Sequence, residues 1–253
     1  MNAARREQLE REEFDRAERA RAWAVHAFTA SGAVLGFLAL VALIEGDLQI
    51  AFLWLGLALA VDGIDGTLAR KARVREVIPQ VDGDTLDNVI DYFTYVVIPA
   101  MAIYWYGFVP EGWAMITAAL VCGVSCYTFA NSGMKSQDYY FVGFPALWNL
   151  VVLVFFIIGS DPWVNLAVIG TCAVLTFVPL KYVHPIRVKY FRRFSIPVTA
   201  LWAATTLGLV LVGKDGAVPR DEAPGTFWVW AAASLYFVAL SLWRSVVGPV
   251  EDD

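Results

Sequence analysis

Long stretches without a charged residue recur along the whole chain and constrain its fold more than any other feature. They lie at residues 23–44, 48–61, 92–110, 112–134, 139–160, 162–180, 194–213 and 223–243. Most reach the roughly 20 residues that an α-helix needs to cross a bilayer. Only 17% of the residues are charged, against about a quarter in a soluble domain. We therefore predict an all-α, polytopic membrane helical bundle with about eight transmembrane helices.

The positions of the basic residues predict how these helices are oriented. With the N-terminus placed in the cytosol, all of the 19 lysines and arginines except Lys214 and Arg220 fall on the cytosolic side. Because cytoplasmic loops carry the excess of lysine and arginine, the sequence predicts cytoplasmic N- and C-termini. The formal net charge of −5 is segregated by loop, so we expect membrane lipids, and no nucleic acid, as partners.

The first residues have a different composition from the rest of the chain. Residues 1–22 are rich in arginine and glutamate, and Glu7 and Arg11 have the i,i+4 spacing of a helix-stabilising pair. We predict an amphipathic helix over residues 1–22 that lies at the cytosolic face of the membrane. A single membrane domain is predicted over residues 23–250. A solvated helical tail without membrane contact is an alternative interpretation of the first segment.

Four aspartates at helical spacing interrupt the apolar sequence. Asp62 and Asp65 are three residues apart, and Asp87 and Asp91 are four apart, so each pair projects from one face of its helix. Two such faces opposed form a cage of four carboxylates, whose charges raise one another's pKa unless cations lie between them. Oxygen ligands of this density predict one or two hard divalent cations. A solvated turn between two membrane helices is the alternative interpretation.

Other residues around the aspartates suit a phosphate-bearing ligand. Gly66 and Gly83 have no side chain, so a backbone or a ligand can approach closely beside the acids. Arg70 offers an always-charged guanidinium suited to phosphate. Asp84 has two interpretations, as a further residue supporting the metal ligands or as an N-terminal helix cap.

The pattern D-x-x-D-G-x-x-A-R, a spacer and G-x-x-x-D-x-x-x-D resembles the signature of the CDP-alcohol phosphotransferases, membrane enzymes of phospholipid synthesis. The signature positions are Asp62, Asp65, Gly66, Ala69, Arg70, Gly83, Asp87 and Asp91. The resemblance implies two divalent ions, Mn²⁺ or Mg²⁺, held by Asp62, Asp65, Asp87 and Asp91. It implies CDP binding by Asp65, Gly66, Ala69, Arg70 and Gly83, and it gives Asp91 the role of catalytic base.

The same resemblance implies the substrates and the location of the protein. The donor is expected to be CDP-diacylglycerol, with CMP as the leaving product. The protein is expected to lie in the bacterial inner membrane and to form a homodimer, because dimers are common in the family and small residues in the third and fourth helices permit close packing.

Further segments resemble the choline-using branch of this family, the bacterial phosphatidylcholine synthases. These segments are residues 81–95, 139–149 and 184–189. A quaternary ammonium is best held by aromatic faces. The candidates for a choline cage beside the acids are Tyr95, Tyr139, Tyr140, Phe141 and Trp148. Because tyrosine and tryptophan are enriched at every membrane interface, an aromatic belt is an alternative explanation for these residues.

Two rival functions remain at this point. Another head-group transferase of the same family, above all a phosphatidylserine synthase, has the same signature. An ion or metal transporter also places carboxylates on paired membrane helices. The two histidines, His26 and His184, are interpreted as interfacial packing or hydrogen-bonding residues and not as bases.

Overall fold

The computed structural model describes residues 14–131, 141–179, 181–182, 192–213, 218 and 223–247. In these ranges the regular secondary structure is helical, apart from an antiparallel pair of two-residue strands, β1 (Phe141–Val142) and β2 (Lys181–Tyr182). The helices are α2 (Arg16–Ile44), α3 (Leu48–Lys71), α4 (Val74–Val77), α5 (Gly83–Asp91), η1 (Tyr92–Val97), α6 (Ile98–Trp105), α7 (Ala114–Ala130), α8 (Trp148–Ile158), α9 (Pro162–Leu175), α10 (Arg192–Val212) and α11 (Pro224–Val247).

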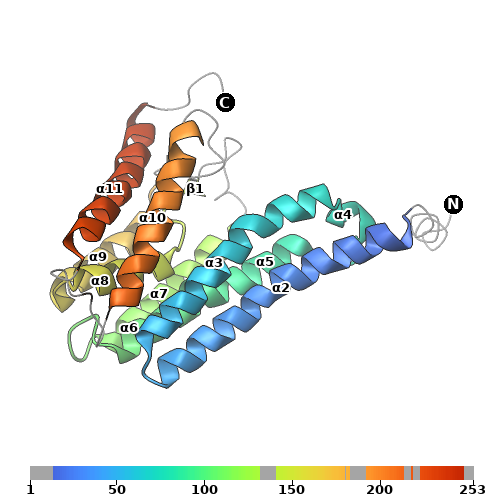
Figure 1. Ribbon diagram of the computed structural model, residues 1–253. Coiled ribbons are helices and arrows are strands. Elements are labelled where there is room, and N and C mark those ends of the chain that lie inside the picture. The colour runs from blue at the N-terminus through green and yellow to red at the C-terminus, as the bar shows by residue number, and fades with distance from the viewer. Residues whose placement is uncertain are drawn as a thin grey trace.

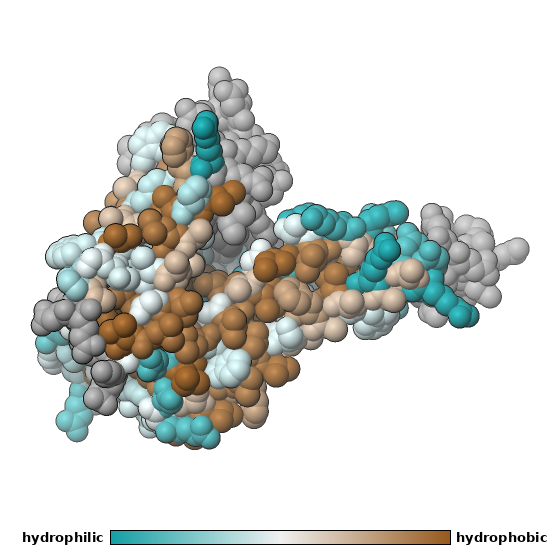
Figure 2. All heavy atoms as spheres, in the orientation of Figure 1, coloured by the Kyte–Doolittle hydropathy of each residue, from teal (hydrophilic) through white to brown (hydrophobic). Residues whose placement is uncertain are grey.

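The helices have the lengths and surfaces of a membrane bundle. Five helical segments are long and apolar enough to cross a bilayer, namely α2, α3, the continuous run 83–105, α10 and α11, and α7, α8 and α9 are shorter apolar helices. Large apolar side chains on their outer faces are more than half exposed, among them Val34, Phe37, Leu57 and Met115. Figure 2 shows hydrophobic residues along the helices and hydrophilic ones gathered at the end formed by α4 and the start of α2. The predicted polytopic helical membrane bundle is confirmed.

Helix α2 begins in the charged segment and continues into the first apolar stretch without a break. A capping box starts it: the Asp15 carboxylate accepts from the Glu18 N–H at 2.7 Å, and the Glu18 carboxylate accepts from the Asp15 N–H at 3.0 Å. Residues 16–22 therefore share one helix with the first span. Residues 1–13 lie outside the described part of the chain, and their interfacial placement stays a prediction.

Helices α2, α3 and α5 lie side by side and form one half of the bundle (Figure 1). Two glycines of α2 make this packing close. A methyl group added at Gly32 would lie 2.9 Å from Ile90, and one added at Gly36 would lie 2.9 Å from both Phe93 and Thr94. The absence of these two side chains lets the segment on both sides of Asp91 approach the backbone of α2.

The third span contains a π-helical turn directly after Asp91. The segment η1 is continuous with α5 before it and α6 after it, so it widens the helix without ending it. Such turns are uncommon and frequently occur at functional sites. The Tyr92 hydroxyl donates to the carbonyl of Cys122 at 3.0 Å, which ties η1 to α7. Three consecutive residues, Thr94, Tyr95 and Val96, are buried, so the wide turn contacts several helices at once.

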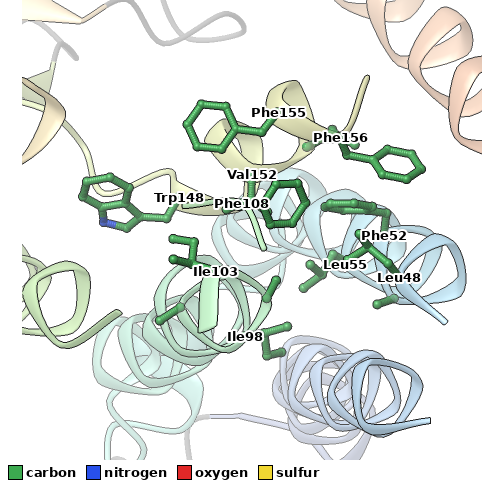
Figure 3. Close-up of a cluster of buried hydrophobic side chains, with 14 of the residues drawn as sticks. Leu48, Phe52, Leu55, Ile98, Ile103, Phe108, Trp148, Val152, Phe155 and Phe156 are labelled. Carbon is green, nitrogen blue, oxygen red and sulfur yellow. The ribbon is translucent and has the colours of Figure 1, made fainter. Parts of the chain in front are cut away.

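An apolar core joins this half of the bundle to the later helices. Phe52 of α3 packs on Phe156 of α8 with ring centroids 5.1 Å apart, and Ile98 and Ile103 of α6 have no exposed surface (Figure 3). The Gln49 amide donates to the carbonyl of Val210 at 2.8 Å and links α3 to α10. The core therefore fixes the third span, which carries two of the aspartates, against α3 and α8.

Close packing against α2 predicts opposite effects for two glycine substitutions. Gly36→Ala should lower the apparent melting temperature in detergent, because the new methyl group lies 2.9 Å from Phe93 and Thr94, and overpacking costs about 1 to 3 kcal/mol. Gly56→Ala on α3 is the matched control, since nothing lies within 4 Å of its added methyl group. It should leave the melting temperature unchanged or raise it, because alanine is the better helix former by about 1 kcal/mol. Equal effects of the two substitutions would contradict the close contact.

Candidate functional site

The four signature aspartates meet where α2, α3 and the third span converge. Carboxylate oxygens of Asp62, Asp87 and Asp91 all lie within 4.8 Å of one another. Asp65 is 6% exposed and lines the same cavity as these three residues. The helical spacing thus places both pairs on facing sides of one cavity, as the sequence predicts.

This donor set fits divalent metal ions. Carboxylate oxygens are the hard ligands that Mg²⁺ and Mn²⁺ prefer. Separations up to 4.8 Å suit one ion, or two ions that share ligands, since paired catalytic metals lie about 3.5 to 4 Å apart. Partly buried carboxylates repel one another at this distance, and a cation between them removes the repulsion. Asp62, Asp87 and Asp91 are therefore the residues best placed to hold a metal.

One carboxylate of the cluster is positioned by a buried tyrosine. The Tyr95 hydroxyl donates to Oδ2 of Asp62 at 2.5 Å, the short distance typical of a bond to a charged acceptor. Tyr95 belongs to η1 and is 5% exposed. A buried bond of this kind restricts the rotation of the Asp62 carboxylate and occupies one of its two oxygens.

The residues predicted to bind the nucleotide lie on two helix ends beside the acids. Gly66, Ala69 and Arg70 belong to the last turns of α3, and Gly83 is the first residue of α5. The Arg70 side chain is exposed, and its guanidinium donates to the Thr67 hydroxyl at 3.0 Å. The structure thus collects these residues at the hydrophilic end of the bundle, next to the aspartate cavity.

The spacer between the two signature halves is a folded polar segment. Asp82 caps α5 by accepting from the N–H groups of Thr85 at 3.2 Å and Asp84 at 3.0 Å. The bond from Thr85, followed by that from Asp84, holds the pKa of the Asp82 carboxyl below its usual value. The alternative in which Asp84 caps the helix is wrong, because its carboxylate pairs with Arg75, and this hydrogen bond raises the pKa of the Arg75 guanidinium.

Comparison with known proteins finds relatives that cover most of the chain. No protein-family model matches the chain. A phosphatidylcholine synthase of Pseudomonas aeruginosa is 48% identical over 227 residues, which cover 90% of this chain and 93% of the relative. A phosphatidylcholine synthase of Agrobacterium fabrum is 46% identical over 230 residues, which cover 91% and 90% of the two chains. One from Mesorhizobium japonicum is 49% identical over 185 residues, 73% of this chain and 69% of the relative.

The chain belongs to the phosphatidylcholine synthase family. The members of this family are enzymes that transfer a phosphatidyl group, so the transporter alternative is set aside.

The aromatic residues predicted for a choline cage have different environments in this family member. Trp148 has no exposed surface, and its indole N–H donates to the Ser125 hydroxyl at 2.8 Å. Contact between Trp148 and a ligand would therefore require the core around it to open. Phe141 lies in β1, and its side chain is outside the described part of the structure, as are Tyr139 and Tyr140. Of the five, Tyr95 has a described contact with the aspartates. The cage stays a prediction.

Helix α2 adds residues to the site that the sequence did not single out. Thr29 and Gly32 line the aspartate cavity, together with Thr94 of η1. The signature lies wholly in α3 and α5, so it contains no information about which helix covers it. The signal available in the sequence was the run of small residues in α2, with Gly32 and Gly36 one turn apart.

Charge repulsion in the cluster predicts that one substitution raises the melting temperature without divalent ions and lowers it, relative to the wild type, when they are bound. Without divalent ions, Asp87→Asn should raise the apparent melting temperature by about 2 to 4 °C, because it removes one of the clustered charges. With Mn²⁺ the wild type should become the more stable protein, since bound metal stabilises only a site that retains its ligands. The measurement is thermal unfolding in detergent with EDTA and then with Mn²⁺.

The matched control is Asp84→Asn in the same helix. Asp84 lies outside the metal cluster and pairs with Arg75 at the surface, so its loss should leave the response to Mn²⁺ intact. A full Mn²⁺ response in Asp87→Asn would contradict the assignment of Asp87 as a ligand.

Proposed function

We propose that the protein transfers the phosphatidyl group of CDP-diacylglycerol to choline, with phosphatidylcholine and CMP as products. The observation that supports this most strongly is the cluster of Asp62, Asp87 and Asp91 in a chain that is 48% identical to a phosphatidylcholine synthase over 90% of its length. In the reaction a bond forms between the choline oxygen and the phosphorus that bears the diacylglycerol, and the bond from that phosphorus to CMP breaks.

The aspartates have two roles in this proposal. Asp62, Asp65, Asp87 and Asp91 would hold one or two Mn²⁺ or Mg²⁺ ions, which neutralise the pyrophosphate and stabilise charge on the departing CMP. Asp91 takes the proton from the choline hydroxyl as general base. Its place supports this role, because it is the last residue of α5 and lies deeper in the bundle than Asp87. Tyr95 keeps the Asp62 carboxylate in one orientation while the substrate binds.

The nucleotide residues bind the donor from the polar end of the bundle. Gly66, Ala69 and Gly83 offer little side-chain bulk, so the CDP group can lie close to the backbones of α3 and α5. The guanidinium of Arg70 is exposed and can donate to a phosphate oxygen of the donor. The diacylglycerol chains extend in the opposite direction, toward the apolar faces of the helices.

The acceptor is assigned to choline on the names of the relatives and on the aromatic residues near the acids. Choline cannot donate hydrogen bonds from its ammonium group, so an aromatic face is its best partner. The hydroxyl of Tyr95 bonds Asp62, and Tyr139, Tyr140 and Phe141 are the further aromatic candidates from the sequence. We propose that these residues contribute to the choline site, with Trp148 supporting them from the core.

The protein is proposed to lie in the bacterial inner membrane with both termini in the cytosol. The basic residues Arg70, Lys71, Arg73 and Arg75 lie at the same end of the bundle as the start of α2, which is the arrangement expected at a cytoplasmic face. A homodimer is also proposed, because the outer face of α7 exposes small residues at Ala119 and Gly123.

The acceptor is tested by labelling. The purified protein in detergent or vesicles, supplied with CDP-diacylglycerol and Mn²⁺, should convert labelled choline into phosphatidylcholine and release one CMP for each choline incorporated. Labelled serine and inositol are the controls and should remain unincorporated. Phosphatidylserine formed in place of phosphatidylcholine would overturn the choline assignment and leave the reaction class unchanged.

The role of Asp91 is tested by removing its charge. Asp91→Asn should lower kcat by about 10²- to 10⁴-fold, because the substituted amide cannot accept the choline proton. Asp84→Asn has the same chemical change two turns earlier, outside the cluster, and should keep near wild-type activity. Stopped-flow or radiometric assay of CMP release gives both rates. CMP release by Asp91→Asn at the wild-type rate would refute the role of Asp91 as base.

A further inference from the structure

His26 of α2 is buried, and one of its polar atoms lacks a partner. Its side chain is 6% exposed, and Nε2 has no hydrogen-bond partner among the residues that the structure describes. An unpartnered buried polar atom costs free energy that folding must recover elsewhere. The imidazole ring is oriented by Trp23, with ring centroids 6.0 Å apart in an edge-on arrangement. Packing alone does not explain a histidine at this position, since an apolar ring would fill it without that cost.

The imidazole ring lies next to a residue of the signature. A methyl group added at Gly83 would lie 3.6 Å from Cε1 of His26, the ring carbon bonded to Nε2. Gly83 is the first residue of α5, and its missing side chain leaves room beside the imidazole. His26 therefore lies beside the first residue of α5, one of the residues proposed to bind the nucleotide.

The order of residues along α2 indicates which part of the donor reaches His26. Thr29 and Gly32 line the aspartate cavity, where the pyrophosphate must lie. His26 is one turn, about 4.5 Å, nearer the start of the helix. One further turn away, Ala22 packs against Val77 and Ile78 near the polar spacer. The lipid end of the donor extends into the bilayer, so the group that lies on the His26 side of the phosphates is the nucleoside.

We propose that His26 binds the cytidine part of the donor and of CMP through a hydrogen bond at Nε2, an inference that rests on the proposed function. A neutral imidazole nitrogen can donate to or accept from a ribose hydroxyl or an edge of the cytosine base. Because Nε2 is buried in the ligand-free protein, the ring must turn for the nucleoside to supply the partner that Nε2 lacks. His26 is thus a specificity residue for the nucleotide and acts on the half of the donor that does not react.

The test compares two ligands that divide the donor at its phosphates. CMP probes the nucleoside and phosphate together, whereas inorganic pyrophosphate probes only the metal and phosphate part. With Mn²⁺ present, His26→Phe should raise the Kd of CMP and the KM of CDP-diacylglycerol about fivefold to tenfold. It should leave pyrophosphate binding and the KM of choline unchanged. His26→Gln retains a polar group and should recover most of the CMP affinity.

A stability measurement separates this role from that of a structural hydrogen bond. Because phenylalanine removes a buried unpartnered nitrogen and keeps a ring of similar shape, His26→Phe should raise the melting temperature of the ligand-free protein by about 2 to 4 °C. A structural hydrogen bond made by the imidazole predicts a lower value instead.

The outcomes that overturn the inference are distinct. Unchanged CMP affinity in a folded His26→Phe protein would refute it and leave the proposed function intact. Equal weakening of CMP and pyrophosphate would also refute it, because the effect would then lie at the phosphates. If His26→Phe does not fold, the His26→Gln protein is used for the same comparison. A His26→Gln protein that loses affinity for CMP and for pyrophosphate to the same extent would refute the contact. A wild-type protein that binds no CMP would overturn the proposed function and this inference together.

Discussion

Repulsion among like charges in an apolar bundle is the constraint on which the rest of this structure depends. Asp62, Asp87 and Asp91 bring oxygens within 4.8 Å of one another, and Asp65 is buried beside them. Such a cluster is stable only if rigid helices hold it and cations or hydrogen bonds offset its charge. The close contact between α2 and η1 at Gly36, and the hydroxyl of Tyr95 on Asp62, supply the rigid support.

The site lies where two chemically different environments meet. On one side are the charged spacer, the exposed Arg70 and the start of α2, and on the other are helices whose outer faces are apolar. A donor with a water-soluble nucleotide at one end and two acyl chains at the other requires both environments within the length of one molecule. Helices α2, α3 and α5, which lie side by side in Figure 1, extend from the charged end into the apolar part of the bundle. His26 lies beside Gly83 at the charged end of α5, and Asp91 is the last residue of that helix.

Much of the site could be predicted because its geometry is local. Spacings of three and four residues place carboxylates on one helix face whatever the fold, so Asp62 with Asp65 and Asp87 with Asp91 were correctly paired from the sequence. The contributions of α2 were not predictable, because nothing local relates Thr29 or His26 to aspartates more than thirty residues away. The cap of α5 was also misjudged, since Asp82 and Asp84 are equally suited to capping and the pairing of Asp84 with Arg75 decided between them.

The sequence by itself determined the membrane bundle, the spacing of the clustered aspartates and the family, because hydrophobic length and helical spacing follow from neighbouring residues alone. Only the tertiary structure decided which helix covers the carboxylates, where the π turn falls, and that Tyr95 directs its hydroxyl to Asp62. The physical reason is packing. A wider turn is stable where Gly36 accommodates Phe93 and Thr94 and where Tyr92 bonds α7, and these contacts join residues from separate helices.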